Sequence, residues 1–270
     1  MDSAKTTIQQ FHDRGWRRFP ASPALDAWIA AARPAAAAVA TSPEHADWHR
    51  HGGTWFVGVN ALPNGATGAL PDGPPLAGPT IDFAMGLTAP QRVEWDRGQV
   101  SICFPGYPLR DPDQSEASHR YRVARDAAHV DGLHAEGPER RRRVREHHGF
   151  ILGIPLAAVQ PGQSPVVVWE GSHHIMRAAF AEALRDVTPD HWADVDITET
   201  YHAARRQCFE TCERVEVTTG PGQSYVIHRL ALHGMAPWTA AASAPRTVIY
   251  FRPTLPDPAA WLADDVETSR

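Results

Sequence analysis

The sequence predicts a mainly β fold with flanking helices, built as a sandwich or barrel of short antiparallel strands. Apolar runs of strand length, joined by Pro-Gly turns, fill the C-terminal half of the chain. Amphipathic patterns of helical period lie at the N-terminus and between the strands. With 270 residues, 43% of them apolar and 21% charged, the chain can bury one large core. It shows no internal repeat and no linker, so we expect a single domain over residues 1–270.

The first 50 residues predict an N-terminal helical segment. Residues 4–13 and 23–40 carry apolar side chains at helical spacing. Ser22 suits an N-cap, and Pro23 stands at the first helical position, where a missing N–H is no loss. Pro34 predicts a break or kink, because it removes a helical hydrogen bond and its ring crowds the preceding turn.

The middle of the chain differs in composition from the helical segment before it. Gly and Pro are dense in residues 61–80, which predicts a loop, and short apolar runs flank it. The alternating run QVSICF at 99–104 predicts a strand. From about residue 148 the pattern is that of β structure.

Strand-turn-strand patterns dominate the remaining chain. A hairpin is predicted from GFILGIPLAAV at 149–159, which is followed by the turn-forming QPGQSP and then by VVVWEG. ERVEVTTGPGQSYVIH at 213–228 repeats this signature. An amphipathic helix is expected within 174–192, between the two hairpins. RTVIYFRP at 246–253 predicts a last strand with Arg246, Val248, Tyr250 and Arg252 on one face.

Charge and cysteine content narrow the class of protein. The formal net charge of −5 lacks the basic excess of nucleic-acid binders, so we expect no nucleic-acid partner. No apolar run approaches the ~20 residues that span a bilayer. The N-terminus also lacks the apolar core of a secretory signal. We therefore expect a cytoplasmic protein without a membrane partner. Cys208 and Cys212, one helical turn apart, are interpreted as small residues on one helix face.

Residues 125–137, RDAAHVDGLHAEG, contain a candidate metal motif. His129 and Asp131 are two residues apart, and on an extended strand such residues point to the same side. Two histidines and a carboxylate on one face are the ligand set of non-haem Fe(II) sites, which leaves positions open for substrate and oxygen. The chain has 15 histidines, so chance matches are expected. His45-Ala46-Asp47 and His134-Ala135-Glu136 are such matches, and a solvated loop is the alternative for every pair.

A third ligand has to come from a distant strand, where His228 and His233 compete. They are five residues apart, so in a straight strand they point to opposite faces. We favour His233, which precedes Gly234 and is followed by the strand that Arg246 opens. His228 is interpreted as a core residue.

The region from about 99 to 253 resembles the phytanoyl-CoA dioxygenase-like family of Fe(II)/2-oxoglutarate-dependent oxygenases. Four motifs occur in the family's order: HVD at 129–131, WEGSH at 169–173, GQSYVIHRLALHG at 222–234, and APRTVIYFRP at 244–253. They match its H-x-D motif, its P-G-S-H-like turn, the stretch with the second histidine, and the strand carrying the 2-oxoglutarate arginine. Glu170 and Gln223 depart from the family's pattern at positions that are not metal ligands.

The resemblance implies a double-stranded β-helix fold, a jelly roll or cupin-like barrel, with its core at about residues 99–253. It implies His129, Asp131 and His233 as ligands of Fe(II), and Arg246 as the residue that binds the cosubstrate 2-oxoglutarate. A planar, permanently charged guanidinium suits the far carboxylate of 2-oxoglutarate, because it can donate two parallel hydrogen bonds. Asp131 favours hydroxylation or another oxidation over halogenation, since related iron halogenases have Gly or Ala at this position.

The sequence therefore predicts a dioxygenase that oxidises a small organic molecule with O2 and converts 2-oxoglutarate to succinate. One alternative is a non-catalytic β-barrel that binds a metal or ligand. Another is a cupin-type metalloenzyme without 2-oxoglutarate, which would not need Arg246. The basic run ERRRRVREHH at 139–148 is interpreted as a solvated face, or alternatively as a clamp for an anionic substrate. The substrate and the oligomeric state stay open at this level.

Overall fold

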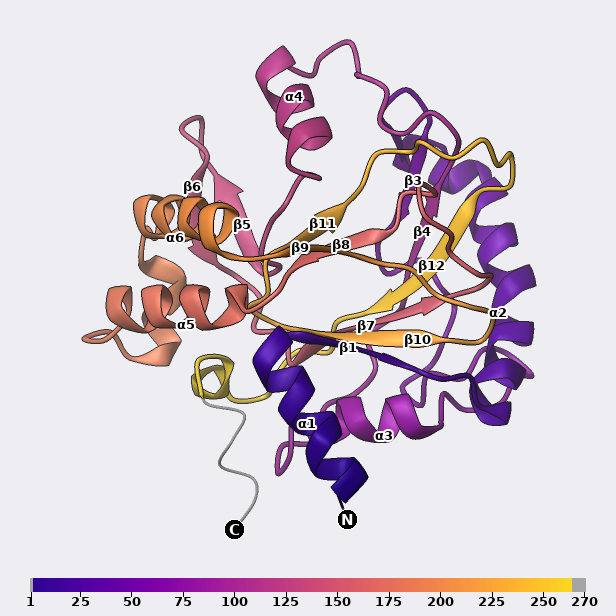
Figure 1. Ribbon diagram of the computed structural model, residues 1–270, viewed down its shortest axis with the longest axis horizontal. Helices are drawn as coiled ribbons and strands as arrows, with labels where there is room; N and C mark the ends of the chain where they lie inside the picture. Colours follow the sequence, from indigo (N-terminus) through magenta and orange to yellow (C-terminus); the bar gives the residue numbers. More distant parts are fainter. Residues whose placement is uncertain (1, 264–270) are drawn as a thin grey trace.

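The structure, a computed structural model, describes residues 2–263. Two antiparallel β-sheets form its centre and face each other as two layers (Figure 1). The major sheet contains, in spatial order, β1 (Trp16–Phe19), β10 (Ser224–His228), β7 (Phe150–Pro155), β12 (Arg246–Phe251), β4 (Gln99–Cys103), β3 (Trp55–Gly58) and β2 (His49–Arg50). The minor sheet contains β11 (His233–Met235), β8 (Val166–Trp169) and β9 (Arg214–Val217). A separate hairpin pairs β5 (Leu133–Glu136) with β6 (Arg141–Val144).

The chain changes sheets repeatedly on its way through the core. From β7 in the major sheet it passes to β8 and β9 in the minor sheet, returns to β10, crosses to β11 and ends the core in β12 of the major sheet. This winding between two antiparallel layers is a double-stranded β-helix, or jelly roll. The predicted fold class, mainly β with flanking helices, is confirmed.

The two hairpins predicted from the sequence are wrong. β7 pairs with β10 and β12, whereas β8 pairs with β9 and β11. β9 and β10 also lie in different sheets. Both Pro-Gly turns reverse the chain as expected, but they connect the two layers instead of neighbouring strands. Turn residues specify a local reversal, whereas the pairing partner depends on contacts with distant segments.

The helices cover the sheets from outside. α1 (Asp2–Arg14), α2 (Pro23–Thr41) and α3 (Pro79–Gly86) lie along the outer face of the major sheet (Figure 1). α5 (Ser172–Ala183) and α6 (Thr198–Thr211) pack on each other at one end, and α4 (Glu116–Ala124) lies beyond the minor sheet. Short 3-10 turns occupy Pro43–Trp48, Pro189–Asp194 and Pro258–Trp261. None of the described helices combines the length and apolar character needed to cross a bilayer.

The predicted start of α2 is confirmed, but a break at Pro34 is wrong. Ser22 caps the helix by accepting a hydrogen bond from the backbone N–H of Leu25, and Pro23 follows at the first position. The helix continues through Pro34 to Thr41. Buried side chains on both sides of the proline, Trp28 and Ala36 among them, hold the two halves against the sheet. Their burial outweighs the local cost of the proline.

The major sheet extends beyond the predicted core segment of 99–253. β1 lies within the segment predicted to be helical, and it pairs with β10 through the registers Trp16 to Ile227 and Phe19 to Ser224. β3 joins β4 on the other side of the sheet. β1 has only four residues, too few for a period of two to stand out in the sequence.

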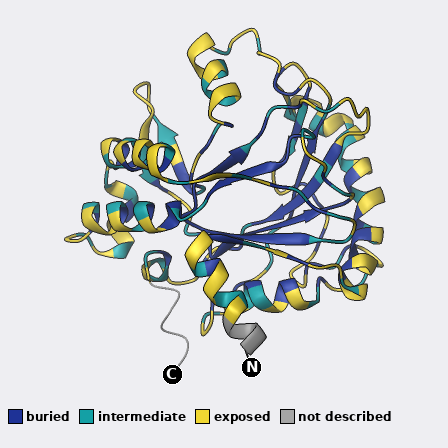
Figure 2. Cartoon of the chain, in the orientation of Figure 1, coloured by how far each residue is buried: buried dark blue, intermediate teal, exposed yellow. Residues whose placement is uncertain are grey.

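Strand alternation sorts side chains between two cores. The central strands β7, β10 and β12 are buried along almost their whole length (Figure 2). Ile249 and Phe251 of β12 point outward into the core under the helices, whereas Val248 and Tyr250 point inward between the sheets. Both faces of the central strands are buried, so the sheet is covered on both sides. The inward face of β12 is the one on which the sequence places Arg246 and Arg252.

Candidate metal centre

Backbone pairing brings the motif at residue 129 to β11. The N–H of His129 donates to the carbonyl of His233 at 2.8 Å, and the N–H of His233 donates back at 3.0 Å. Gly234 permits this close pairing, because a Cβ there would lie 2.2 Å from the carbonyl oxygen of Asp126. Asp131, two residues after His129, lies on the same side of the chain. Segments about 100 residues apart thus form one short ladder.

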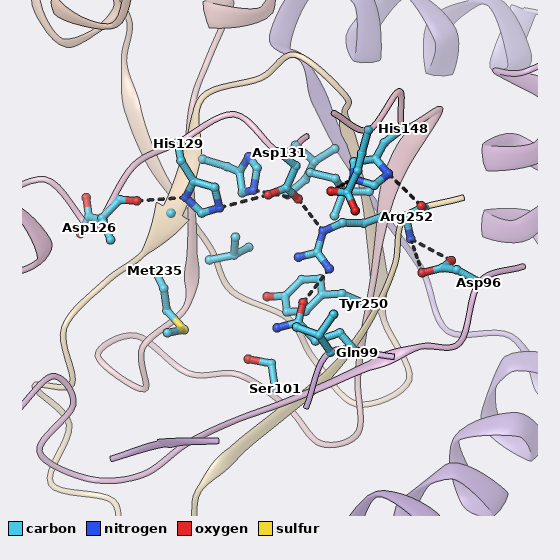
Figure 3. A pocket seen from close by; sticks show the side chains of 18 of the residues that line it. Asp96, Gln99, Ser101, Asp126, His129, Asp131, His148, Met235, Tyr250 and Arg252 are labelled. Carbon is cyan, nitrogen blue, oxygen red and sulfur yellow. Dashed lines mark hydrogen bonds and ion pairs between the residues drawn. The ribbon is translucent and has the colours of Figure 1, made fainter. Parts of the chain in front are cut away.

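The three predicted ligand side chains converge. His129 Nε2 lies 3.1 Å from Asp131 Oδ1, and His233 Nε2 lies 3.6 Å from Asp131 Oδ2. One ligand atom from each residue lies within 4.8 Å of the other two, the only such group among residues 2–263. Figure 3 shows His129 and Asp131 pointing toward each other from the cavity wall.

Hydrogen bonds fix the orientation of both imidazoles. His129 Nδ1 lies 3.0 Å from the carbonyl of Ala127, and His233 Nδ1 lies 2.9 Å from the carbonyl of Ala231. A carbonyl only accepts, so each Nδ1 carries a proton and each Nε2 faces the common point, where it can give a lone pair to a metal that displaces its proton. Two nitrogens and one carboxylate oxygen fit a divalent transition metal such as Fe(II) or Zn(II).

The competing histidines have other partners. His134 contacts Glu146, with Nε2 and Oε2 3.3 Å apart, and Glu136 pairs with Arg145. His45 lies against Glu44 on the exposed turn before β2. His228 is buried, and its ring packs against those of Phe11 and His173 rather than lining the cavity. The geometry therefore favours His233 over His228, as the sequence predicts.

Asp131 is held as a carboxylate by its neighbours. Burial alone would raise its pKa, but the charge of Arg252 and hydrogen bonds with His129 and His233 hold that pKa well below the usual range. Arg252 donates from Nε to Asp131 Oδ2, and its Nη1 donates to Gln99 Oε1 at 2.6 Å (Figure 3). Arg252 is not among the site residues that the sequence predicts. Its position on the inward face with Arg246 is the signal that points to it.

Arg246 is buried without an anionic partner. Its Nη2 lies 3.3 Å from the Cys103 thiol and 2.7 Å from the Met235 thioether, and its Nη1 lies 3.4 Å from the Tyr250 hydroxyl. Its Nε has no hydrogen-bond partner, and no carboxylate of the described residues forms an ion pair with it. Burial raises the pKa of the Cys103 thiol, so this sulfur stays neutral. A buried cation without a counter-charge suits an anionic ligand.

A cavity of about 350 Å³ connects these groups. The three candidate ligands line it, as do two contacts of Arg246, Met235 and Tyr250. Ile151, Val166 and Ile227 form an apolar wall between the sheets. Besides the candidate ligands, the polar lining residues are Asn60, Asp96, Gln99, Ser101, Arg122, Asp126, Glu146, His148, Tyr250, Arg252 and Thr254. A cavity with an apolar wall and convergent polar groups fits a small organic ligand.

The arginines at 140–143 of the basic run make contacts outside the cavity, whereas Glu146 and His148 of the same run line it. Arg141 pairs with Glu139 at 2.9 Å, Arg143 lies 3.7 Å from Glu136, and the Arg142 guanidinium lies 5.9 Å from the ring centroid of Tyr201. None of residues 140–143 lines the cavity. These contacts favour the solvated-face interpretation over the substrate clamp.

Comparison with known proteins gives similarity of fold at low sequence identity. No family model matches the sequence, and no curated protein matches it. AviO1 from Streptomyces viridochromogenes Tue57 aligns with a TM-score of 0.50 and 15% identity over 93% of this chain and 95% of that protein. The chain shares the fold of AviO1. The double-stranded β-helix that the sequence motifs imply is confirmed by the strand order of the two sheets.

Two further solved structures are similar at lower scores. SnoK, described as a non-haem α-ketoglutarate-dependent carbocyclase from nogalamycin biosynthesis, aligns with a TM-score of 0.48 and 13% identity over 92% of this chain and 83% of its own. EctD from S. alaskensis, solved with bound Fe, aligns with a TM-score of 0.48 and 14% identity over 93% of this chain and 76% of its own.

Proposed function

We propose that the protein is an Fe(II)- and 2-oxoglutarate-dependent dioxygenase that oxidises a small organic molecule. The observation that carries this proposal is the convergence of His129, Asp131 and His233 within 4.8 Å at the wall of a cavity. Three protein ligands on one side leave open positions for a chelating cosubstrate and O2. The motif resemblance and the double-stranded β-helix support the same reaction class.

The chain's own residues have distinct tasks in this proposal. His129 and His233 hold the metal through Nε2, with ring orientations set by the carbonyls of Ala127 and Ala231. Asp131 supplies the single anionic ligand atom, and Arg252 holds its other oxygen. Iron bound together with 2-oxoglutarate supplies the oxidising chemistry, in which O2 is consumed and 2-oxoglutarate is converted to succinate.

Arg246 is the proposed partner of the far carboxylate of 2-oxoglutarate. Its contacts with a thiol and a thioether are weak hydrogen bonds, so a carboxylate would replace them at a gain. The Tyr250 hydroxyl, which accepts from Arg246 and lines the cavity, lies at the same end. This buried arginine favours the oxygenase over a cupin-type enzyme without 2-oxoglutarate.

The proposal is tested with Asp131→Asn and anaerobically purified protein. Wild type incubated with Fe(II), 2-oxoglutarate, O2 and a metabolite library should release succinate, and stimulating compounds identify substrates. Asp131→Asn should lose this activity and bind Fe(II) at least about tenfold more weakly, because the ligand set loses its anion.

His134→Ala is the matched control. It removes a histidine of similar motif spacing whose side chain pairs with Glu146 instead. It should leave Fe(II) binding and succinate release unchanged. Wild-type Fe(II) affinity in Asp131→Asn, with circular dichroism showing both variants folded, would reject the metal assignment.

A further inference from the structure

Arg122 is a second arginine at the cavity that lacks an anionic partner. It lies in the last turn of α4 and lines the cavity that contains the candidate metal centre. Its Nη1 donates to the Tyr107 hydroxyl at 2.9 Å, and its guanidinium carbon lies 5.7 Å from the ring centroid of Trp55. Its Nε is buried without a hydrogen-bond partner, and no carboxylate of the described residues forms an ion pair with it.

The acids near Arg122 are already engaged. Both oxygens of Asp126 accept hydrogen bonds from Arg214 at 2.8 Å. Asp111 accepts from the backbone N–H groups of His51 and Gly52 at 2.9 and 2.7 Å. The charge of Arg122 is therefore not balanced by a direct contact.

Two ionisable side chains beside Arg122, those of His51 and Tyr107, are neutral near pH 7. The ring of His51 stacks on Trp55 at 5.8 Å, and burial followed by the charge of Arg122 lowers the pKa of His51 to about 4. Burial raises the pKa of Tyr107 to about 12. Neither group carries a charge that offsets the guanidinium, so this part of the cavity attracts anions.

The anchoring of α4 keeps Arg122 at the cavity. The neighbouring Tyr121 donates its hydroxyl to the carbonyl of Ala128 at 2.7 Å, and the guanidinium of Arg205 in α6 lies 4.9 Å from its ring centroid. Because Tyr121 packs toward α6, Arg122 is turned to another side of the helix. Trp55 beneath it is fixed by a 3.0 Å hydrogen bond from Nε1 to the Ser101 hydroxyl.

We propose that Arg122 binds an anionic group, a carboxylate or a phosphate, of the primary substrate, while Trp55 packs against the adjoining apolar or flat part of that molecule. This inference rests on the proposed function, because the bound molecule is a substrate only if the protein is an enzyme. A guanidinium offers paired donors to a planar anion, and an indole face beside it favours a ring or chain next to the charge. The site is distinct from Arg246, which contacts Met235 and Cys103 rather than Trp55.

The test uses phenylacetate and phenyl phosphate as anionic probes and phenylacetamide as their neutral analogue. Dissociation constants are measured by ligand-observed NMR on the full chain with Zn(II), which replaces iron without turnover. We expect both anions to bind roughly 10- to 100-fold more tightly than the amide. Arg122→Gln should remove that preference, and Arg122→Lys should restore part of it.

A double comparison separates this site from the cosubstrate site. Arg122→Gln should weaken the anionic probes but leave the 2-oxoglutarate dissociation constant within twofold, whereas Arg246→Ala should do the reverse. Arg120→Gln, an exposed arginine of the same helix that pairs with Glu116, is the control and should change neither.

Three outcomes would overturn the inference: anion and amide binding equally, probe affinity unchanged in Arg122→Gln, or 2-oxoglutarate affinity falling with that of the probe. If 2-oxoglutarate and metal fail to bind while the probes still depend on Arg122, the anion site stands and the oxygenase proposal fails.

Discussion

At the scale of single residues, the carboxylate of Asp131 contacts two groups at once. One oxygen faces His129 at 3.1 Å, and the other accepts from Arg252. Arg252 is held in turn by Gln99, and its backbone N–H donates to Asp96 at 3.0 Å. This chain of contacts fixes the direction of the proposed anionic ligand before any metal binds. Partners that orient a ligand in this way commonly affect metal affinity strongly.

Arg252→Gln should therefore weaken Zn(II) or Fe(II) binding by roughly 10- to 100-fold. Loss of the positive charge would by itself favour a cation. However, the carboxylate also loses the partner that orients it toward the metal position, and this loss should outweigh the gain from the removed charge. The measurement is a competition titration with a chromophoric chelator at pH 7. Arg145→Gln, an exposed arginine paired with Glu136, is the control. Equal or tighter binding in Arg252→Gln would contradict the orienting role.

Arg246→Ala should weaken 2-oxoglutarate binding by roughly 30- to 1,000-fold. A shielded, two-pronged pair is worth on the order of 2–4 kcal/mol when one partner is removed, at ~1.4 kcal/mol per tenfold. Metal affinity should change little, because Arg246 contacts none of the three ligand side chains. Arg246→Lys should recover only part of the affinity.

Isothermal titration with 2-oxoglutarate in the presence of Zn(II) measures this effect. Arg185→Ala, which changes an exposed arginine just after α5 that pairs with Glu182, is the control. A dissociation constant within twofold of wild type in Arg246→Ala would leave the cupin-type alternative as the better description.

At the scale of elements, the packing of β7 between β10 and β12 supports the arginine site. Gly153 of β7 lies opposite Tyr225 of β10 and Tyr250 of β12. The ring of Tyr225 crosses Gly153 so closely that a Cβ there would lie 2.1 Å from Tyr225 Cε2. The Tyr225 hydroxyl donates to that of Tyr250 at 3.0 Å, and Tyr250 accepts from Arg246. The missing side chain at Gly153 thus leaves room for the Tyr225 ring, whose hydroxyl bonds to Tyr250 beside Arg246.

Gly153→Ala should destabilise the protein by about 1–3 kcal/mol, the usual cost of overpacking a core. Most strands tolerate this change, but here the added methyl must displace a buried tyrosine ring. The free energy of unfolding is measured by urea titration. Gly86→Ala at the end of α3 is the matched control, because its Cβ would meet open space. That variant should be neutral or stabilised by up to about 1 kcal/mol. Equal effects at the two sites would refute the packing argument.

At the scale of the whole molecule, Glu170 joins the two layers. It follows β8 of the minor sheet, and its Oε1 accepts from Trp16 Nε1 of β1 in the major sheet at 2.7 Å. Arg14 donates from Nε to the same oxygen at 2.7 Å, and the N–H of Gly171 donates to the carbonyl of Arg14 at 3.1 Å. The residue that departs from the family's pattern thus fastens the N-terminal strand to the far sheet.

Glu170→Ala should lower the free energy of unfolding by about 1–3 kcal/mol, since it leaves the indole N–H of the mostly buried Trp16 without its acceptor. Glu170→Pro, which introduces the family's residue, should be no more stable. Glu182→Ala breaks an exposed ion pair with Arg185 and should stay within about 0.5 kcal/mol of wild type. Unfolding in urea, followed by tryptophan fluorescence, compares the three variants. A Glu170→Ala protein as stable as Glu182→Ala would rule out a structural role for this contact.

The sequence by itself determined the positions of most core strands and the identity of the candidate ligands. Period-two alternation marks β4 and β12, and the Pro-Gly turn marks the start of β10. The H-x-D spacing marks His129 and Asp131. All these signals arise within a few neighbouring residues. Arg246 followed from the motif resemblance. Metal and 2-oxoglutarate binding by these four residues remain predictions that the variants above test.

Only the tertiary structure decided which strands pair and which side chains share the cavity. Both predicted hairpins became crossings between sheets, and the four-residue β1 became an edge of the major sheet. Arg252, directly after β12, and Arg122, in α4, reach the cavity from elements far apart in the chain. The physical reason is that local patterns record backbone conformation and burial, whereas pairing and side-chain neighbourhood depend on the summed contacts between segments far apart in the chain.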